Sequence, residues 1–348
     1  MKIKKLAAVF FTALIVCVCG VGNVNATECS HASLAEASDY LLTSDEVEVS
    51  TVEVDSWDGT TPAETDDNIY YSFTPKDAAP VTAFIILPGG NSDPKAYAPL
   101  AYRIAAEGFL VIILPVPDCV AMPTGQLRAE KIISDFEEIE KWAIGGHSVG
   151  GTAACLYAKK DAVIDGVIIW ASIPPNILVN TNLKVITIYG SEDGRNPPDQ
   201  VVLFAKLLPA DAIYVEIEGG NHTQFAYYDT SPDPYLEEDN AATITLEEQQ
   251  EIIANHTSDF LSNMPQRPQP DSVCPAAKLL GEDNPQLDTI RQFRDKVLVK
   301  NPLGRKLIDL YYKNGDIVIS ILDRHPMIQK STRNLLESLV PAMEQILK

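Results

Sequence analysis

One serine stands in a setting that can turn its hydroxyl group into a nucleophile. Ser148 is flanked by glycines in the segment 146–150, with an apolar run at 142–145 before it and a helical pattern at 149–160 after it. The strand-to-helix turn of a GxSxG sequence is tight, and it lifts the serine hydroxyl above the sheet at the N-terminus of a helix, where negative charge is favoured. We therefore predict that Ser148 is a nucleophile.

A serine nucleophile needs a base, and the base needs a carboxylate that fixes its tautomer. The loops after the next predicted strands carry Glu192 and Asp193, and then His222. Because the carboxyl ends of parallel strands meet at one edge of a sheet, these side chains can converge on Ser148. The sequence predicts His222 as the general base and Asp193 as its acid partner, with the neighbouring Glu192 as the alternative.

Two backbone amides are expected to hold the negative oxygen of a tetrahedral intermediate. Val149 follows the nucleophile, and Gly90 lies in a loop after the apolar run 81–87. Glycine at this point allows the main chain to approach a bound carbonyl group closely. We predict that Gly90 and Val149 form the oxyanion hole, with Gly89 as the alternative to Gly90. The residues expected to line the substrate pocket are Gly89, His147 and Phe225.

Short apolar runs alternate with helical patterns through the middle of the chain. Continuous apolar strands between helices indicate a parallel sheet that is buried on both faces. The predicted fold class is therefore α/β, a mostly parallel doubly wound sheet with a small all-α C-terminal appendage. Expected strands cover 47–54, 81–87, 110–114, 142–145, 166–170, 185–189 and 213–217, and expected helices cover 97–107, 126–140, 149–160, 198–208 and 246–264.

Four short segments within residues 69–264 carry a family resemblance. They are Leu-Pro-Gly-Gly-Asn (87–91), Gly-Gly-His-Ser-Val-Gly-Gly (145–151), Tyr-Gly-Ser-Glu-Asp-Gly (189–194) and Gly-Gly-Asn-His-Thr-Gln-Phe (219–225). Together they resemble the α/β-hydrolase superfamily, in its compact dienelactone-hydrolase-like branch. The resemblance implies the α/β-hydrolase fold and the chain order Ser, Asp, His. Pro88 stands where many members carry the histidine of an HG oxyanion motif.

The expected site is open. Only residues 171–183 separate two predicted strands at the point where larger relatives insert a lid. This favours small or accessible acyl groups as substrates. No cofactor or metal is expected, because the five histidines never fall at the HExxH spacing and the cysteines are too widely spaced for a CxxC-type zinc site. The histidines expected to lie outside the sheet-end loops are His31, His256 and His325.

The N-terminus predicts export. Three lysines precede the apolar run 6–22, and Val24-Asn25-Ala26 offers a cleavage site, so residues 1–26 read as a secretory signal peptide. The net charge of -21 repels nucleic acid and anionic membranes. We expect a secreted or extracytoplasmic bacterial protein with no membrane span in its mature form and no nucleic-acid partner. Disulfides can persist there, and the sequence leaves open the pairing of Cys29, Cys119, Cys155 and Cys274.

The proline-rich segment 265–273 predicts a linker, because proline fixes φ and removes a backbone donor. It separates an α/β domain at 27–264, with an N-terminal edge-strand region at 27–68, from a helical domain at 274–348. We expect three or four short helices in the latter. Residues 289–313 resemble the CFI-box C-terminal domain, although the segment 274–278 keeps the cysteine of that box and little else. The resemblance implies an accessory domain, and it leaves open whether that domain serves sorting, tethering, contact with a surface or protein partner, or packing alone.

Taken together, these features predict a serine carboxylic-ester hydrolase that acts on a small-molecule ester through a Ser-His-Asp triad and an acyl-enzyme intermediate. A peptidase or a thioesterase of the same fold is the nearest alternative, although such peptidases usually carry a propeller or a cap. A noncatalytic surface-binding protein is the alternative from another class, and it would be expected to lack a member of the triad.

Overall fold

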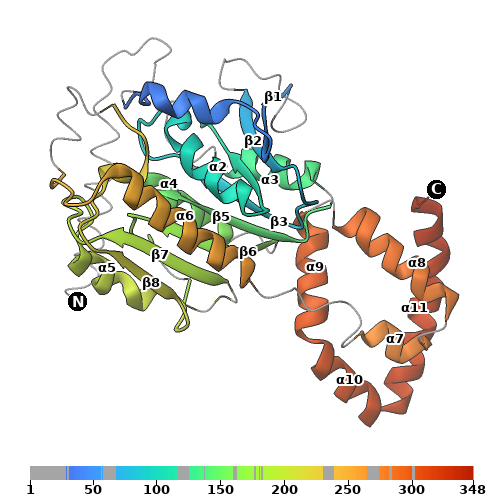
Figure 1. Cartoon of the computed structure of the whole chain (residues 1–348). Helices are drawn as coiled ribbons and strands as arrows, with labels where there is room; N and C mark the ends of the chain where they lie inside the picture. Colours follow the sequence, from blue (N-terminus) through green and yellow to red (C-terminus); the bar gives the residue numbers. More distant parts are fainter. Residues whose placement is uncertain are drawn as a thin grey trace, which may run out of the picture.

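The computed structural model describes residues 29, 31–55, 57, 68–116, 125–136, 138–159, 163–175, 178–179, 181, 183–229, 239–264, 274–281, 284–299 and 302–347. The predicted signal peptide and the linker 265–273 lie outside these residues. Eight strands form one sheet in the order β1-β2-β4-β3-β5-β6-β7-β8 (Figure 1). The strands are β1 (Val47–Glu53), β2 (Ile69–Pro75), β3 (Thr82–Leu87), β4 (Leu110–Ile113), β5 (Lys141–His147), β6 (Ile164–Trp170), β7 (Lys184–Gly190) and β8 (Ile213–Ile217).

The sheet is mostly parallel. Strand β2 pairs antiparallel with both β1 and β4, and all other pairs are parallel. The chain passes from β3 to β4 on one side and then returns to β5 on the other side of β3. Such a reversal opens a crevice at the carboxyl ends of β3 and β5, where ligands bind in open α/β sheets. Ser148 follows β5 directly and therefore lies at this crevice.

Helices cover both faces of the sheet. Helices α2 (Ala98–Ala106) and α6 (Leu246–Ser262) contribute to one core, and α3 (Gly125–Asp135) and α4 (Val149–Ala158) contribute to the other (Figure 1). The sequence of β3 requires cover on both faces, since all six of its side chains are buried and successive residues point into opposite cores. This arrangement confirms the predicted fold class. The remaining elements of this part are η1 (Ala35–Leu41), η2 (Pro94–Tyr97), α5 (Pro198–Phe204), η4 (Ala205–Leu207) and η5 (Thr223–Phe225).

Two local expectations differ from the structure. The helix expected at 126–140 ends at Asp135, because the chain turns at Phe136, whose ring packs against Tyr70 and Trp142. The expected strands omitted β2, although its alternation of aromatic and polar residues is typical of a strand. Its pairing with both neighbours completes the sheet on the β1 side.

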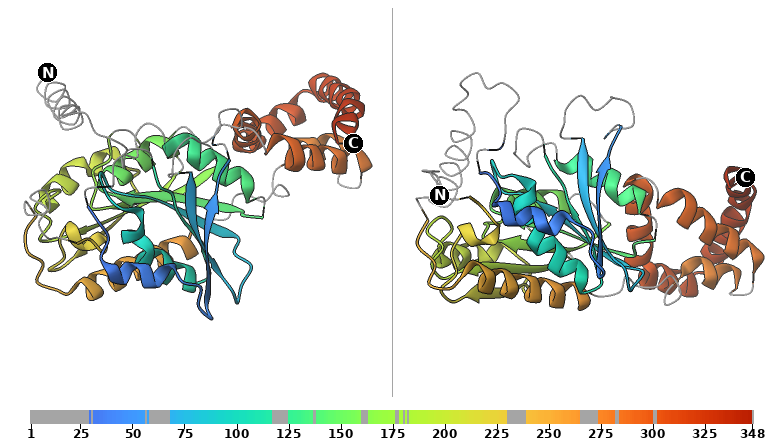
Figure 2. Two further views of the ribbon diagram at one scale, coloured as in Figure 1. Left: turned by 90° about the horizontal axis from the view of Figure 1, so that it is seen from above. Right: turned by 45° about the horizontal axis from the view of Figure 1, so that its top comes forward.

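The C-terminal region contains more helices than expected. Five α-helices lie in its described part, so the prediction of three or four short helices was wrong, and the last of them has 21 residues. Proline occupies the first position of four of them, where its missing amide hydrogen is not needed. These helices gather apart from the sheet (Figure 2). They are α7 (Pro275–Leu280), α8 (Pro285–Phe293), α9 (Pro302–Lys313), α10 (Gly315–Arg324) and α11 (Pro326–Ile346), with a π-helical turn, η6 (Arg294–Leu298), after α8.

Three cysteines lie in the described part of the chain. Cys29 is disulfide-bonded, whereas Cys155 and Cys274 carry free thiols. Cys119 lies outside the described residues. Within the described parts of the chain, no helix is both long and apolar enough to cross a membrane.

Candidate active site

Ser148 occupies a strained turn between β5 and α4. Its backbone has φ 53° and ψ −119°, a region that residues other than glycine rarely adopt. Its amide donates to the carbonyl oxygen of Trp170 at 3.0 Å, and its own carbonyl oxygen accepts from the Ser172 hydroxyl at 2.5 Å. A strained backbone of this kind costs on the order of 1–3 kcal/mol and persists only where its surroundings fix it. Here both peptide groups of the serine are fixed.

The glycines of the turn are required by packing. A Cβ atom on Gly146 or on Gly150 would lie 2.1 Å from the carbonyl oxygen of Leu87, and one on Gly151 would lie 2.7 Å from Ser172 Cβ. The end of β3 therefore presses directly against the turn. This contact explains the GxSxG spacing in terms of the space available.

His222 and Asp193 form a buried pair. The two atoms His222 Nδ1 and Asp193 Oδ2 are 2.9 Å apart, and the two residues are only 3% and 1% exposed. A carboxylate can only accept, so the pair places the imidazole proton on Nδ1 and leaves Nε2 able to accept a proton. Asp193 Oδ1 accepts the amides of Arg195 at 2.9 Å and Asn196 at 2.7 Å. Glu192 instead accepts from the Ser191 hydroxyl at 3.4 Å.

Two residues that the sequence analysis missed hold the loops of this pair. Asp239 accepts the amide of Gly194 at 2.9 Å and the amide of Thr223 at 2.8 Å, so it ties the Asp193 loop to the His222 loop. Gln249 is fully buried, and its side-chain amide exchanges two hydrogen bonds with the backbone of Asn221, at 2.9 and 2.8 Å. The sequence gives no sign that these two polar side chains turn inward, because each lies more than 15 residues from its partners.

The two residues predicted to form the oxyanion hole lie close together. The register pairs Leu87 with Gly146, which brings the loop after β3 beside the turn. A Cβ atom on Gly90 would lie 3.3 Å from Val149 Cγ2, so the Gly90 backbone lies beside the Val149 side chain. The Gly89 amide donates to the Tyr97 hydroxyl at 2.9 Å and is therefore occupied. Among the described residues, no hydrogen bond occupies the amides of Gly90 and Val149.

Ser148 and His222 line the same small pocket. The predicted residues Gly89, Gly90 and His147 also line it. Phe225 is fully buried and stacks on the ring of His147, with the ring centroids 5.6 Å apart, so it lies behind the pocket wall. The pocket residues that the sequence analysis missed are His31, Ser92, Arg195 and Tyr228.

The comparison with known families agrees with this geometry. Residues 83–251 match the model of the alpha/beta hydrolase family, a segment that begins in β3, contains Ser148, Asp193 and His222, and ends within α6. No curated protein matches the sequence. This is an α/β-hydrolase fold. The fold and the family match together support a hydrolase.

One further histidine of the α/β domain lies at the site. His31 lies outside the sheet-end loops, as predicted, but it forms an isolated parallel bridge with Ser92 of such a loop and therefore lines the pocket. The segment around it has no strand or helix pattern. Only its pairing with a loop far along the chain brings it to the site.

The side chain of His147 is held neutral. Burial is the main cause that lowers the pKa of His147 well below 6.5, and the nearby charges of His222 and Arg195 lower it further. Its ring centroid lies 4.5 Å from that of His222. Because His147 stays uncharged, a proton taken up by His222 meets no cationic ring beside it.

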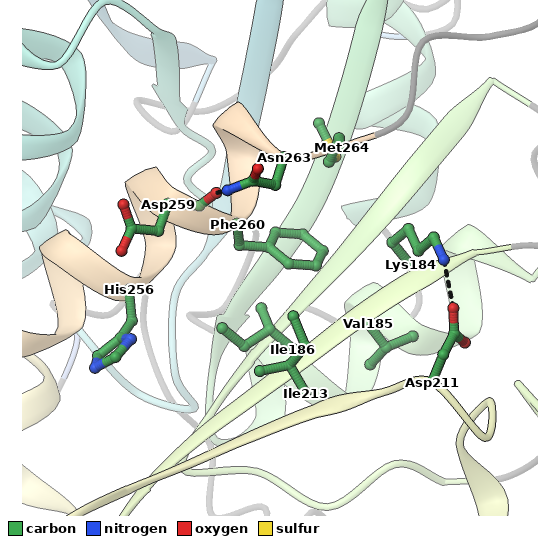
Figure 3. A pocket seen from close by; sticks show the side chains of 10 residues that line it. All are labelled: Lys184, Val185, Ile186, Asp211, Ile213, His256, Asp259, Phe260, Asn263 and Met264. Carbon is green, nitrogen blue, oxygen red and sulfur yellow. Dashed lines mark hydrogen bonds and ion pairs between the residues drawn. The ribbon is translucent and has the colours of Figure 1, made fainter.

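A second cavity, of about 360 Å³, lies at the opposite ends of β7 and β8 from the Asp193 and His222 loops (Figure 3). Its floor is apolar, with Ile186, Ile213 and Phe260, and its rim carries the ion pair of Lys184 with Asp211. His256 lies on α6 at this cavity. It contains none of the predicted site residues, so the smaller pocket at Ser148 is the candidate active site.

Proposed function

We propose that this chain is a serine hydrolase that cleaves carboxylic esters through Ser148, His222 and Asp193. One observation carries the proposal: a strained serine lines the same pocket as a histidine whose Nδ1 is bonded to a buried carboxylate. The family match supports a hydrolase of this fold. Burial of the carboxylate and its two backbone amide donors keep it oriented toward the imidazole.

In the first half of the reaction, Ser148 Oγ attacks the carbonyl carbon of the ester while His222 Nε2 takes the hydroxyl proton. The carbonyl oxygen becomes an oxyanion, which the amides of Val149 and Gly90 stabilise. Asp193 stabilises the imidazolium that forms. The C–O bond to the leaving group then breaks, His222 returns its proton to the alkoxide, and an alcohol leaves an acyl group on Ser148.

In the second half, water replaces the alcohol. His222 removes a proton from the water as its oxygen attacks the acyl carbon, and the same two amides hold the second oxyanion. Collapse of this intermediate breaks the bond to Ser148 Oγ, which regains its proton from His222. The products are a carboxylic acid and the free enzyme, so no cofactor enters the balance of the reaction.

Small or accessible acyl groups are the proposed substrates. The connection between β6 and β7 runs only from Ala171 to Leu183, where a lid would be inserted, and the pocket at Ser148 is small. A short connection also supports membership of the compact dienelactone-hydrolase-like branch. A long acyl chain would find little apolar surface to cover it.

Export and an accessory C-terminal domain are part of the proposal. The leader pattern at 1–26 supports secretion, and so does the disulfide at Cys29, since disulfides persist in oxidising compartments. The C-terminal helices expose several large apolar side chains, which supports contact with a surface or a protein partner, as in the resemblance to a degenerate CFI-box domain. These side chains include Leu307, Leu310, Met327, Leu335 and Leu339.

The test is hydrolysis of p-nitrophenyl acetate, butyrate and octanoate by the mature chain. We expect cleavage of the two short esters and a loss of several orders of magnitude in kcat for Ser148→Ala and His222→Ala. Matched controls are Ser134→Ala, an exposed serine on α3, and His256→Ala at the distant cavity, and both are expected to retain wild-type rates. If the wild-type chain cleaves no ester, the ester proposal fails, and thioesters and peptides are the next substrates to test.

A further inference from the structure

Three buried hydroxyl groups form a cluster beneath the loop that carries Gly90. We call Ser92, Tyr97 and Tyr228 the hydroxyl cluster. The hydroxyl groups of Tyr97 and Tyr228 share a short hydrogen bond, and Tyr228 also bonds Ser92 Oγ at 2.7 Å. Burial raises the pKa of Tyr97 to about 12 and raises that of Tyr228 well above its usual value. Both phenols therefore stay neutral and able to donate.

The residues of the hydroxyl cluster form hydrogen bonds with three of the four backbone polar groups of Gly89 and Gly90. The Gly89 amide donates to the Tyr97 hydroxyl at 2.9 Å, and the Gly90 carbonyl oxygen accepts from Ser92 Oγ at 3.3 Å. The Gly89 carbonyl oxygen accepts the Ser92 amide at 3.4 Å. The N–H of a trans peptide points away from its C=O, so fixing the Gly89 carbonyl group also fixes the direction of the Gly90 amide.

The cluster also contacts the nucleophile turn. His147 Nδ1 lies 3.0 Å from the Tyr97 hydroxyl and 3.2 Å from the Tyr228 hydroxyl, and His147 immediately precedes Ser148. One set of hydroxyl groups thus touches both chain segments that would supply an oxyanion amide. A change in the cluster can therefore alter the position of Gly90 relative to Val149.

The N-terminal segment 31–33 also pairs with the loop that carries Gly90 and with Tyr228. The His31 amide donates to the Asn91 carbonyl oxygen at 2.8 Å, and the Asp93 amide donates to the His31 carbonyl oxygen at 2.9 Å. Ser33 pairs with Tyr228 in an antiparallel bridge. Three segments that are distant in the sequence therefore meet at the hydroxyl cluster, which explains how the loop can be held without regular secondary structure.

We propose that Tyr97 and Tyr228 are positioning residues that set the place and direction of the Gly90 amide for the oxyanion. The inference rests on the proposed function, and it concerns an interaction made only when the carbonyl oxygen becomes negative. Removing an oxyanion donor lowers kcat about 10²- to 10³-fold. Displacing one by a fraction of an ångström is expected to lower kcat about 10- to 100-fold and to leave KM nearly unchanged.

The test uses Tyr97→Phe and Tyr228→Phe, which keep the rings and remove one hydroxyl each. Tyr102→Phe is the matched control. The Tyr102 hydroxyl donates to Ser44 Oγ at 2.7 Å, and this hydrogen bond lies away from the site. With p-nitrophenyl acetate, we expect kcat to fall about 10- to 100-fold in the two test variants, with KM within about twofold, and the control to match the wild type. Affinity for a trifluoromethyl ketone, which forms a tetrahedral adduct with the serine, is expected to fall in parallel with kcat.

A purely structural role would give a different pattern. In that case kcat per folded molecule would equal the wild-type value, or KM and kcat would change together with the melting temperature, and the proposal would be overturned. Parallel loss of kcat and of ketone affinity at an unchanged KM supports it.

Amide hydrogen exchange separates this inference from the proposed function. We expect the Ser92 amide to exchange at least about tenfold faster in Tyr97→Phe than in the wild type or in Tyr102→Phe, because the loop loses an anchor. This readout needs no ester activity, so a wild type inert toward all esters would refute the proposed function and leave the positioning of the loop testable. Faster exchange confined to Gly89 would refute the positioning role.

Discussion

Asp193→Asn is expected to abolish most of the activity while keeping the fold. Asp193 Oδ1 accepts two backbone amides, from Arg195 and Asn196, so an asparagine at this position must keep its carbonyl oxygen there. Its side-chain NH₂ group is then forced toward His222 Nδ1, where the carboxylate oxygen stood at 2.9 Å. Because two donors cannot face each other, the imidazole changes tautomer and its Nε2 carries the proton.

A base with a proton on Nε2 cannot accept one from Ser148. The equivalent change in a Ser-His-Asp triad lowers kcat by about 10⁴, which corresponds to about 5.5 kcal/mol in the activation free energy. The two backbone bonds at position 193 survive, so the melting temperature is expected to stay near that of the wild type. Asp193→Ala removes those bonds as well and is expected to cost a further 1–3 kcal/mol, roughly, in the free energy of unfolding.

The assay is the steady-state hydrolysis of p-nitrophenyl acetate together with thermal unfolding. Glu192→Gln is the matched control, because this carboxylate neighbours Asp193 and bonds Ser191. It is expected to keep kcat within about threefold of the wild type. A kcat for Asp193→Asn within tenfold of the wild type, or a large loss in Glu192→Gln, would refute the assignment of the acid.

Three further predictions concern the surroundings of the site. Asp239→Ala frees the amides of Gly194 and Thr223 and is expected to lower kcat about tenfold and to reduce the melting temperature, whereas Asp211→Ala at the distant cavity should change neither kinetics nor calorimetry appreciably. Gly146→Ala places a Cβ atom 2.1 Å from the Leu87 carbonyl oxygen and is expected to abolish the cooperative thermal transition, so a soluble variant that melts like the wild type would contradict the packing argument. The pKa of His147 is lowered in the folded state, so below pH 6.5 the unfolded chain binds more protons than the folded chain. The stability that this residue contributes is therefore present above pH 6.5 and is lost as the pH falls, by up to about 1.4 kcal/mol per pH unit. Denaturant titrations at several pH values should show this slope reduced in His147→Gln, and an unchanged slope would exclude His147 as its source.

The sequence predicted the sheet because most of its parallel strands are buried on both faces. Such a strand is largely apolar, as in β3 and β7, so even a single sequence marks it clearly. The order of the strands then predicted that Ser148, Asp193 and His222 lie at one edge of the sheet, since each follows the carboxyl end of its strand, and in the structure Ser148 and His222 line one pocket. The pair of His222 with Asp193 rather than Glu192 required coordinates, because adjacent acids in a loop point in different directions.

The residues that support the site could not be predicted from the sequence. His31, Tyr228 and Asp239 act through contacts with segments far along the chain, and the patterns around them are those of ordinary loops. Gln249 lies on an amphipathic helix, and its complete burial follows only from the path of the Asn221 loop above it. Among the described side chains after residue 274, few are buried, so the apolar periodicity of these helices gave a weak indication of their number and length.

The most direct test of the central claim is covalent labelling with a fluorophosphonate, followed by intact-mass measurement and peptide mapping of the mature chain. We expect one adduct per molecule on Ser148, loss of ester hydrolysis in proportion to labelling, and much slower labelling of His222→Ala. Ester hydrolysis that persists after complete labelling, or an adduct on a residue other than Ser148, would contradict the central claim.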